Sequence, residues 1–241
     1  MNNQDFELKQ FASAKEREWT VSEAFPALMR KVYVWMTLAL AITGLTAYGV
    51  ATSPGILQTI YGNSAVLWGI AIAELILVIT VSSAINRLSL SVATLLFIIY
   101  SVLNGTLFSS IFLVYTASSI ATVFFITAGT FAAMALVGYT TKTDLSSMGK
   151  ILLMALIGMI IATIVNLFVK STGLDLIISY IGVLVFVGLT AYDSQKIKQM
   201  LLQAPDAGEG AQKVALLGAL SLYLDFINLF LYLLRIFGRR D

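Results

Sequence analysis

The sequence predicts an all-α integral membrane protein with seven transmembrane helices. Of the 241 residues, 59% are apolar and 12% are charged, whereas soluble domains average about 45–50% apolar and about 25% charged residues. Residues 32–73 and 88–141 contain no charged side chain at all. Each of these stretches is long enough for two helices of about 20 residues joined by a turn, so an ordinary soluble domain is excluded.

The seven helices are placed by the lengths of the apolar runs and by the turn signals between them. Pro54 and Gly55 break the first long stretch, and the polar residues 116–119 break the second. All three prolines (Pro26, Pro54 and Pro205) fall outside the predicted spans. These spans cover residues 32–51, 64–85, 89–113, 118–140, 151–170, 174–194 and 214–236.

The first 31 residues are predicted to form a polar cytoplasmic tail, followed by a transmembrane domain over residues 32–241. The tail contains five basic and five acidic side chains. A short amphipathic helix and a disordered segment are both open, and the charge density favours a solvated segment. It lacks the basic, apolar and small-residue order of a cleavable signal peptide. The first helix is therefore expected to serve as an uncleaved signal.

Basic residues in the short loops predict the orientation, because cytoplasmic loops carry an excess of Lys and Arg. With the N-terminus in the cytoplasm, the cytoplasmic segments hold eleven Lys and Arg, and the outer loops hold Lys170. Arg235, Arg239 and Arg240 would then lie outside, which leaves a full crossing or a re-entrant segment as alternatives for the last helix. The length of residues 214–237 favours a crossing.

The composition excludes several classes of site. The chain contains no Cys and no His, which excludes disulfides, His- or thiolate-ligated zinc, haem with such axial ligands, and Ser-His or Cys-His nucleophiles. A net charge of +2 provides no basic stripe for nucleic acid. No Gly-rich strand-to-helix turn suggests a nucleotide, so no soluble cofactor is expected.

Three acidic residues fall within or at the edge of the predicted spans. Glu74 and Asp225 lie near the middle of the second and seventh helices, and Asp193 lies near the cytoplasmic end of the sixth. A carboxylate at the centre of a membrane helix costs about 2.5–3.5 kcal/mol, and such groups usually face a partner or a water-filled cavity. These three residues are therefore candidate functional residues.

The seventh helix carries a polar stripe. Its members recur at steps of four and three residues, which places them on one helix face. Two interpretations are open for such a stripe: interhelical hydrogen bonds, worth about 0.6 kcal/mol each in membranes, or the lining of a hydrated path. Interhelical hydrogen bonds are the favoured interpretation for Ser221, Asn228 and Tyr232, and the hydrated path is favoured for Asp225. If such a path exists, Glu74 and these three residues are expected to form its supporting polar lining. The stripe consists of Ser221, Asp225, Asn228, Tyr232 and Arg235.

Three segments resemble the Bax inhibitor-1 (transmembrane BAX inhibitor motif) family. They are residues 138–145 (GYTTKTDL), residues 188–198 (GLTAYDSQKIK) and residues 222–238, which run from LYLDFINLF to RIFG. The resemblance covers all seven spans. Short loops and the lack of an organelle-type tail place the sequence nearest the bacterial members, and hence in the bacterial cytoplasmic (inner) membrane.

The resemblance implies a fold in which the seventh helix is central and wrapped by the other six. It also implies that Asp193 and Asp225 act together as a pH-sensitive element. Members of the family are described as proton-responsive leak pathways for calcium and, in eukaryotes, as suppressors of cell death. Some members have an arginine in the second helix that latches the sixth-helix aspartate. Here Ile85 stands at that position, and Arg87 is the nearest candidate latch.

The chemistry of two carboxylates agrees with what the resemblance implies. Two such groups in one desolvated site cannot both ionise cheaply, so Asp193 and Asp225 are expected to share a proton and to titrate as a unit. When both are ionised they attract a hard divalent cation. Calcium usually takes six or more oxygen ligands, so water or backbone carbonyls would complete a weak, transient site.

The function predicted from these observations is a pH-sensitive calcium leak that is not an enzyme. One alternative is a non-transporting regulator that binds a membrane protease or another membrane complex through its charged tail. Another is that the acidic residues only stabilise the bundle. An intramembrane aspartyl protease is disfavoured because Leu222, Tyr223 and Leu224, rather than a Gly-x-Gly sequence, precede Asp225.

Overall fold

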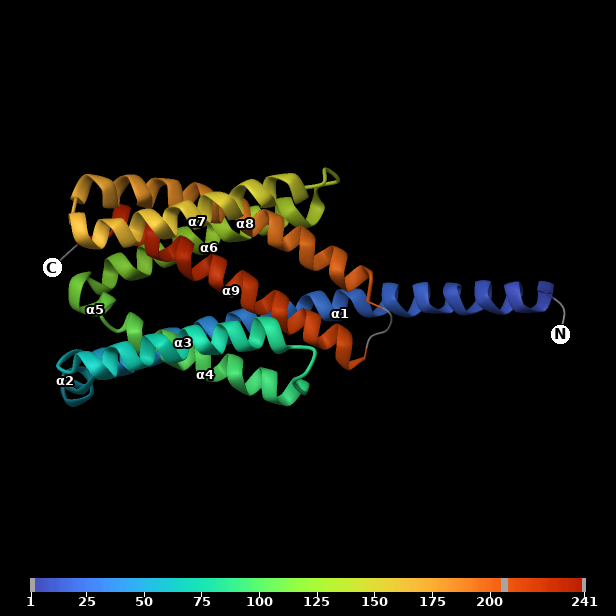
Figure 1. The fold of residues 1–241 in the computed structure, drawn as a ribbon, viewed down its shortest axis with the longest axis horizontal. Helices are drawn as coiled ribbons and strands as arrows, with labels where there is room; N and C mark the ends of the chain where they lie inside the picture. Colours follow the sequence, from blue (N-terminus) through green and yellow to red (C-terminus); the bar gives the residue numbers. More distant parts are fainter. Residues whose placement is uncertain (1–2, 205–207, 240–241) are drawn as a thin grey trace.

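Nine helices are found in the part of the chain that the computed structural model describes, which comprises residues 3–204 and 208–239, with side chains from residue 23 onward. They form an elongated bundle from which the N-terminal part of α1 projects (Figure 1). The helices are α1 (Asn3–Ala51), α2 (Pro54–Tyr61), α3 (Ser64–Ala84), α4 (Leu90–Phe108), α5 (Ile111–Val114), α6 (Ala117–Thr140), α7 (Ser146–Val169), α8 (Thr172–Leu202) and α9 (Glu209–Phe237).

Within residues 3–204 and 208–239, seven segments are long and apolar enough to cross a membrane. They are residues 23–51 of α1, α3, the pair α4 and α5 together, α6, α7, α8 and α9. Their outward faces are covered with large apolar side chains such as Leu45, Phe125 and Phe168, as expected of surfaces that contact lipid. The predicted all-α class with seven candidate transmembrane helices is confirmed.

The first helix begins earlier than predicted. Instead of starting at residue 32, α1 runs without a break through residue 31, and its apolar span begins at Glu23. Pro26, which was expected outside the spans, therefore lies inside this one. Proline removes one helical hydrogen bond, but Phe25, Leu28 and Met29 around it are buried in the core. Their packing compensates for the weakened helix.

The third predicted helix is interrupted, and the predicted loop before the second contains a helix. Pro54 begins the short helix α2, at the position where a proline is tolerated best. At its other end, the Tyr61 hydroxyl donates to the Leu107 carbonyl oxygen (2.9 Å) and accepts from the Ser110 backbone N–H (3.1 Å). Tyr61 thus satisfies backbone groups at the break between α4 and α5.

Two helices extend beyond their predicted ends. α8 continues to Leu202 rather than residue 194, because its added turns bury Ile197 and Leu201. Asp193 consequently lies well inside α8 and not at its edge. α9 is one unbroken helix of 29 residues whose two ends lie at opposite ends of the bundle (Figure 1). This continuity favours a full crossing over a re-entrant segment.

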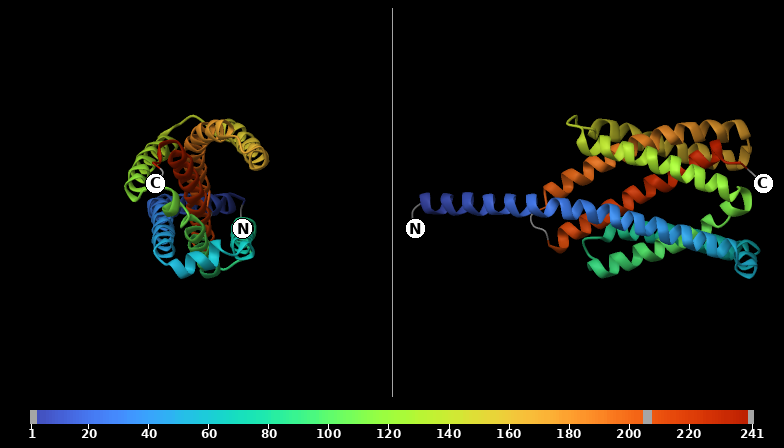
Figure 2. Two further views of the ribbon diagram at one scale, coloured as in Figure 1. Left: turned by 90° about the vertical axis from the view of Figure 1, so that its left-hand side faces the viewer. Right: turned by 180° about the vertical axis from the view of Figure 1, so that it is seen from behind.

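The last span, α9, is the innermost helix. In its most apolar stretch 67% of the residues are buried, the highest share of any span. It packs against α1, α4, α6 and α8, whereas α3 packs mainly on α4 and α7 mainly on α8. Seen end-on, α9 lies between the group that contains α3 and α4 and the group that contains α7 and α8 (Figure 2). The prediction that all six other helices wrap it stays a prediction.

Glycines allow the closest helix contacts. A Cβ atom on Gly138 of α6 would overlap the backbone of Ala191 in α8, and one on Gly182 of α8 would overlap the ring of Tyr232 in α9. Small residues are common at membrane helix interfaces because they let neighbouring backbones approach. These two glycines therefore fix how near α6 and α9 come to α8.

We expect Gly138→Ala to destabilise the protein by roughly 1–3 kcal/mol, the usual cost of overpacking a filled interface. The matched control is Gly129→Ala on the same helix, where a Cβ meets nothing within 4 Å. That change should be neutral or stabilising by up to about 1 kcal/mol, because Ala favours a helix more than Gly does. Thermal unfolding in detergent measures both, and equal effects would contradict the assignment.

Candidate functional site: a buried carboxylate pair between α8 and α9

The structure brings the two predicted aspartates together. Asp193 comes from α8 and Asp225 from α9, and these helices form the most extensive helix–helix contact. Asp225 is 4% exposed, and its Oδ2 atom has no hydrogen-bond partner among the described residues. The carboxyl group of Asp193 is near enough to act on it electrostatically. Asp225 is thus a buried acid whose neighbour is another acid.

Two further polar groups adjoin the pair. Ser194 Oγ is buried and lacks a hydrogen bond of normal geometry, although the Tyr33 hydroxyl of α1 approaches it. Lys196 is the basic side chain that acts electrostatically on Asp193, and its ammonium group also lies 5.7 Å from the centre of the Tyr192 ring. Buried polar atoms in proteins are rarely left without a partner, so a proton, a water or a cation would complete this site.

The carboxylates alone are a sparse metal site. Within residues 3–204 and 208–239, no group of three or more Asp, Glu, His or Cys side chains is placed to hold a metal ion. Calcium prefers six to eight oxygen ligands. Asp193 and Asp225 could therefore hold calcium only with water or backbone carbonyls as the remaining ligands, which fits transient binding better than storage.

Glu74 belongs to a separate polar cluster. Asn104 of α4 donates hydrogen bonds from Nδ2 to Glu74 Oε1 and to the Tyr100 hydroxyl, the latter at 3.2 Å. No interaction found in the described part of the chain joins Glu74 to Asp193 or Asp225. The structure therefore places Glu74 between α3 and α4, away from the carboxylate pair.

This second cluster continues into α1 and α9. The Tyr223 hydroxyl lies 2.7 Å from Thr43 Oγ1, and Thr43 Oγ1 donates to the Ser101 carbonyl oxygen (3.0 Å), so Tyr223 is the donor in the first contact. The Tyr223 ring also packs edge-on against Tyr100. Hydrogen bonds and ring contacts thus join α1, α4 and α9 in the middle of the bundle, as the interhelical interpretation of polar residues expects.

The rest of the α9 stripe is divided among different contacts. Asn228 donates to the carbonyl oxygen one turn earlier in its own helix (2.8 Å). Tyr232 stacks on Phe186, and Arg235 lies 3.6 Å from Asp175 Oδ1 of α8. Ser221 is half-buried. The stripe therefore does not form one hydrogen-bonded chain, and Asp225 is its most buried member.

The candidate latch is not engaged. Arg87 is exposed in the turn between α3 and α4 and, among the described residues, forms no ion pair with Asp193. Ile85, at the position where a latch arginine was expected, is buried in the core. The latching role of Arg87 stays a prediction.

Gln195 is a structural residue that the sequence analysis did not single out. Its side chain accepts from the Leu145 backbone N–H and donates to the Thr143 carbonyl oxygen, both at 2.8 Å. Gln195 thereby ties α8 to the loop between α6 and α7. Its position two residues after Asp193, within one of the motif segments, was the signal that could have identified it.

Comparison with known proteins agrees with this architecture. Residues 26–241 match the family model described as "Inhibitor of apoptosis-promoting Bax1". The chain is 53% identical to inner membrane protein YbhL of Escherichia coli over 213 residues, which are 88% of this chain and 91% of the relative. It is also 46% identical to a protein of Borreliella burgdorferi over 88% of this chain and 91% of the relative.

A seven-span helical membrane protein with a buried aspartate on its innermost helix is the class that the fold and the site define. The chain belongs to the Bax inhibitor-1 family. The predicted family membership is thereby confirmed, and the match extends over all seven spans.

We expect Asp225→Asn to leave thermal stability unchanged or to raise it. The substitution keeps the shape of the side chain and removes both the carboxylate and its repulsion with Asp193. The matched control is Asp175→Asn, which removes the partner of Arg235 at a partly exposed site and should cost about 0–1 kcal/mol. A loss of about 1–3 kcal/mol for Asp225→Asn, the usual result of breaking a buried hydrogen bond, would show that the carboxylate is well satisfied.

Proposed function

We propose that the protein is a pH-sensitive calcium leak of the bacterial inner membrane, and not an enzyme. The observation that supports this proposal is the buried Asp225 carboxyl group, whose Oδ2 lacks a hydrogen-bond partner in the described part of the chain and whose neighbour is Asp193. A bundle that needed only hydrogen bonds could use uncharged polar residues at lower cost. The pair therefore favours a role in which its charge changes.

In the proposed mechanism protons and calcium compete for Asp193 and Asp225. With one proton shared, the pair carries a single negative charge and attracts a divalent cation weakly. When the proton leaves, two adjacent carboxylates in a desolvated site attract a hard cation more strongly than the singly charged pair does. Conduction requires binding that is favourable enough to admit the ion and weak enough to release it, and two carboxylates with water meet this requirement.

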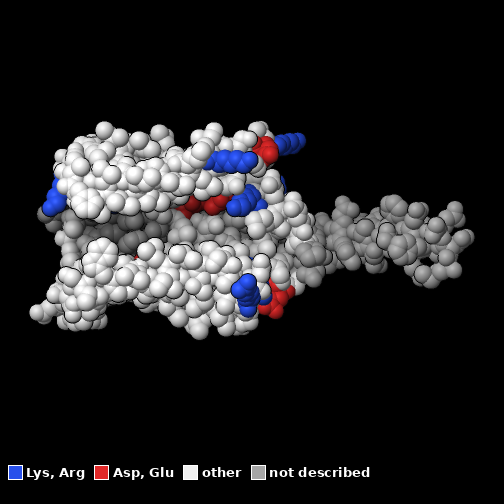
Figure 3. Space-filling view, in the orientation of Figure 1, with Lys and Arg blue, Asp and Glu red and all other residues white. Residues whose placement is uncertain are grey.

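The proposed orientation places the N-terminus in the cytoplasm. Basic side chains gather at the end of the bundle from which α1 projects (Figure 3), and cytoplasmic loops are enriched in such residues. YbhL, the Escherichia coli relative, carries the name of an inner membrane protein. Both observations support a multi-pass protein of the inner membrane with the Arg87 and Lys142 turns inside.

A second candidate function is supported by the projecting part of α1. Its backbone continues as a helix beyond the bundle (Figure 1), where another protein could contact it. In this alternative the protein does not transport ions but regulates a membrane protease or another membrane complex. The two functions differ in whether the purified protein conducts calcium.

The leak is tested by calcium influx into dye-filled proteoliposomes at pH 6, 7 and 8. Wild-type flux should change across this range, because the charge of the pair changes, and Asp193→Asn with Asp225→Asn should abolish the flux or make it independent of pH. The single change Asp225→Asn should already remove the pH response. Retention of the wild-type response in that variant would refute the proposed sensor.

Two further variants serve as controls in the flux experiment. The Ser146 hydroxyl and backbone N–H lower the pKa of the Asp144 carboxyl, so Asp144 stays ionised from pH 6 to 8 and Asp144→Asn should keep the response. Deletion of residues 2–22, which leaves the buried Phe25 in place, should also keep it. Absence of wild-type flux at every pH would favour the regulator.

The orientation is tested with single cysteines, which the Cys-free chain allows. Thr143→Cys and Thr172→Cys both introduce a thiol at an exposed position, one in the α6–α7 loop and one at the start of α8. A membrane-impermeant maleimide added to intact spheroplasts should label Thr172→Cys alone, and lysis should expose the other. Labelling of only Thr143→Cys before lysis would reverse the proposed orientation.

A further inference from the structure

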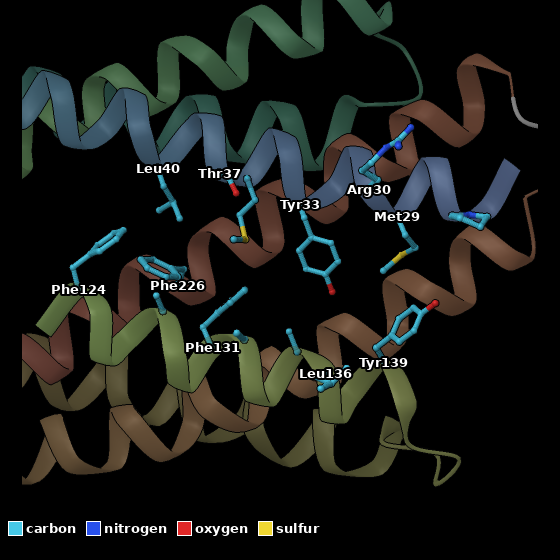
Figure 4. Close-up of a pocket in the computed structure, with 15 residues that line it drawn as sticks. Met29, Arg30, Tyr33, Thr37, Leu40, Phe124, Phe131, Leu136, Tyr139 and Phe226 are labelled. Carbon is cyan, nitrogen blue, oxygen red and sulfur yellow. The ribbon is translucent and has the colours of Figure 1, made fainter. Parts of the chain in front are cut away.

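A groove of about 680 Å³ lies between α1 and α6, on the opposite face of the bundle from that shown in Figure 3. In Figure 4 Tyr33 of α1 and Tyr139 of α6 point into it from two sides, Arg30 extends from the side of α1 away from α6, and Phe226 of α9 lies at the inner end. α1 and α6 contact each other at one end, where Phe25 stacks on Tyr139. Its volume is in the range of ligand pockets, about 300–1,000 Å³.

The groove has the length of one bilayer leaflet. Along α1 its lining extends from Pro26 to Leu40, which corresponds to about 21 Å of helix rise. Half of a bilayer, with its headgroup layer included, is about 20–22 Å thick. Leu40 and Phe124 lie at the opposite end of the groove from Arg30 and Tyr139 (Figure 4). One acyl chain extending from the membrane surface to the bilayer centre matches this length.

The groove is lined mainly by apolar side chains. Met36, Phe131 and Ala135 in its lining are buried. Leu40, Phe124 and Phe226 also border a smaller apolar recess of about 100 Å³ farther along α1. Side chains at both edges of the groove, such as Leu136 of α6, are exposed on the surface that would contact lipid.

The outer end of the groove is basic. Arg30 lines it and is exposed, and the Lys198 ammonium group lies 4.9 Å from the centre of the Tyr139 ring, which also lines it. Lys198 also donates to the Tyr139 carbonyl oxygen (2.8 Å). Glu23, the one acidic side chain described on α1, lies about two turns farther out along the helix. Two positive charges thus lie at the end where a lipid headgroup would be.

We propose that this groove binds one acyl chain of an anionic glycerophospholipid, with the lipid phosphate at Arg30. An apolar groove one leaflet deep, with a cationic end at the membrane surface, is complementary to such a lipid and to few other molecules of a bilayer. The proposal does not depend on the cation leak.

The bound lipid would lie next to the carboxylate pair. Tyr33 lines the groove and also approaches Ser194, which follows Asp193 in the sequence. Phe226 at the inner end follows Asp225. Tyr33 would therefore contact both the lipid and Ser194, so that occupancy of the groove bears on the position of α1 beside the site.

The acyl-chain site is tested by photocrosslinking in nanodiscs of phosphatidylcholine that contain a phosphatidylglycerol with a diazirine on its acyl chain. Mass spectrometry should locate the crosslinks mainly in residues 29–40 and 124–139. Ala132→Trp places a large side chain in the groove and should abolish them. Its matched control is Ala133→Trp, on the same helix and also exposed but outside the lining, which should retain them.

The headgroup site is tested by native mass spectrometry of the delipidated protein with phosphatidylglycerol and phosphatidylcholine. Arg30→Gln should weaken phosphatidylglycerol binding about fivefold, which corresponds to the ~1 kcal/mol that a basic residue contributes near anionic lipid. Lys150→Gln, an exposed basic residue on α7 outside the groove lining, should have no such effect.

Several outcomes would overturn the proposal. Crosslinks spread evenly over the outward faces of α6 and α7 would show ordinary boundary lipid. Equal losses in Ala132→Trp and Ala133→Trp, both with wild-type thermal midpoints, would show that the groove is not the site. Equal retention of the two phospholipids would exclude a preference for an anionic headgroup. A protein segment found bound in the groove would show that the occupant is a partner protein and not a lipid.

Discussion

The packing of α8 against α9 is the contact on which the rest of the structure depends. It joins the two most buried spans, and small residues allow the close approach: Gly182 lies against Tyr232, and Gly218 against Ile197. Without a hydrophobic driving force between helices in lipid, such van der Waals contact holds a bundle together. The same approach forces two acidic residues into one site, so the stability of the bundle and the chemistry of the site have a common origin.

Much of the fold could be predicted because the requirements of a bilayer are visible in a single sequence. Runs of about 20 apolar residues identify spans irrespective of their neighbours. The errors concern features that depend on contacts between distant segments. The Tyr61 hydroxyl supports the break between α4 and α5, and the burial of Phe25 and Leu28 carries α1 past Pro26. No local pattern encodes either contact.

The candidate site could likewise be predicted only in part from the sequence. The spacing of polar residues along α9 and the cost of a membrane carboxylate pointed to Asp225, and the motif segments pointed to Asp193. Glu74 is an acid in a span like the other two, but the hydrogen bond from Asn104 holds it in another cluster. The proximity of Tyr33 to Ser194 depends on the rotation of α1 relative to α8, and no local sequence pattern predicts that rotation.

The two hydrogen bonds of Gln195 have a mechanical consequence. Because Gln195 holds both Thr143 and Leu145, the helix that carries Asp193 is fastened to the ends of α6 and α7. A displacement of Asp193 away from Asp225 would therefore move α6, α7 and α8 together relative to α9, and the 141–145 loop would move with them.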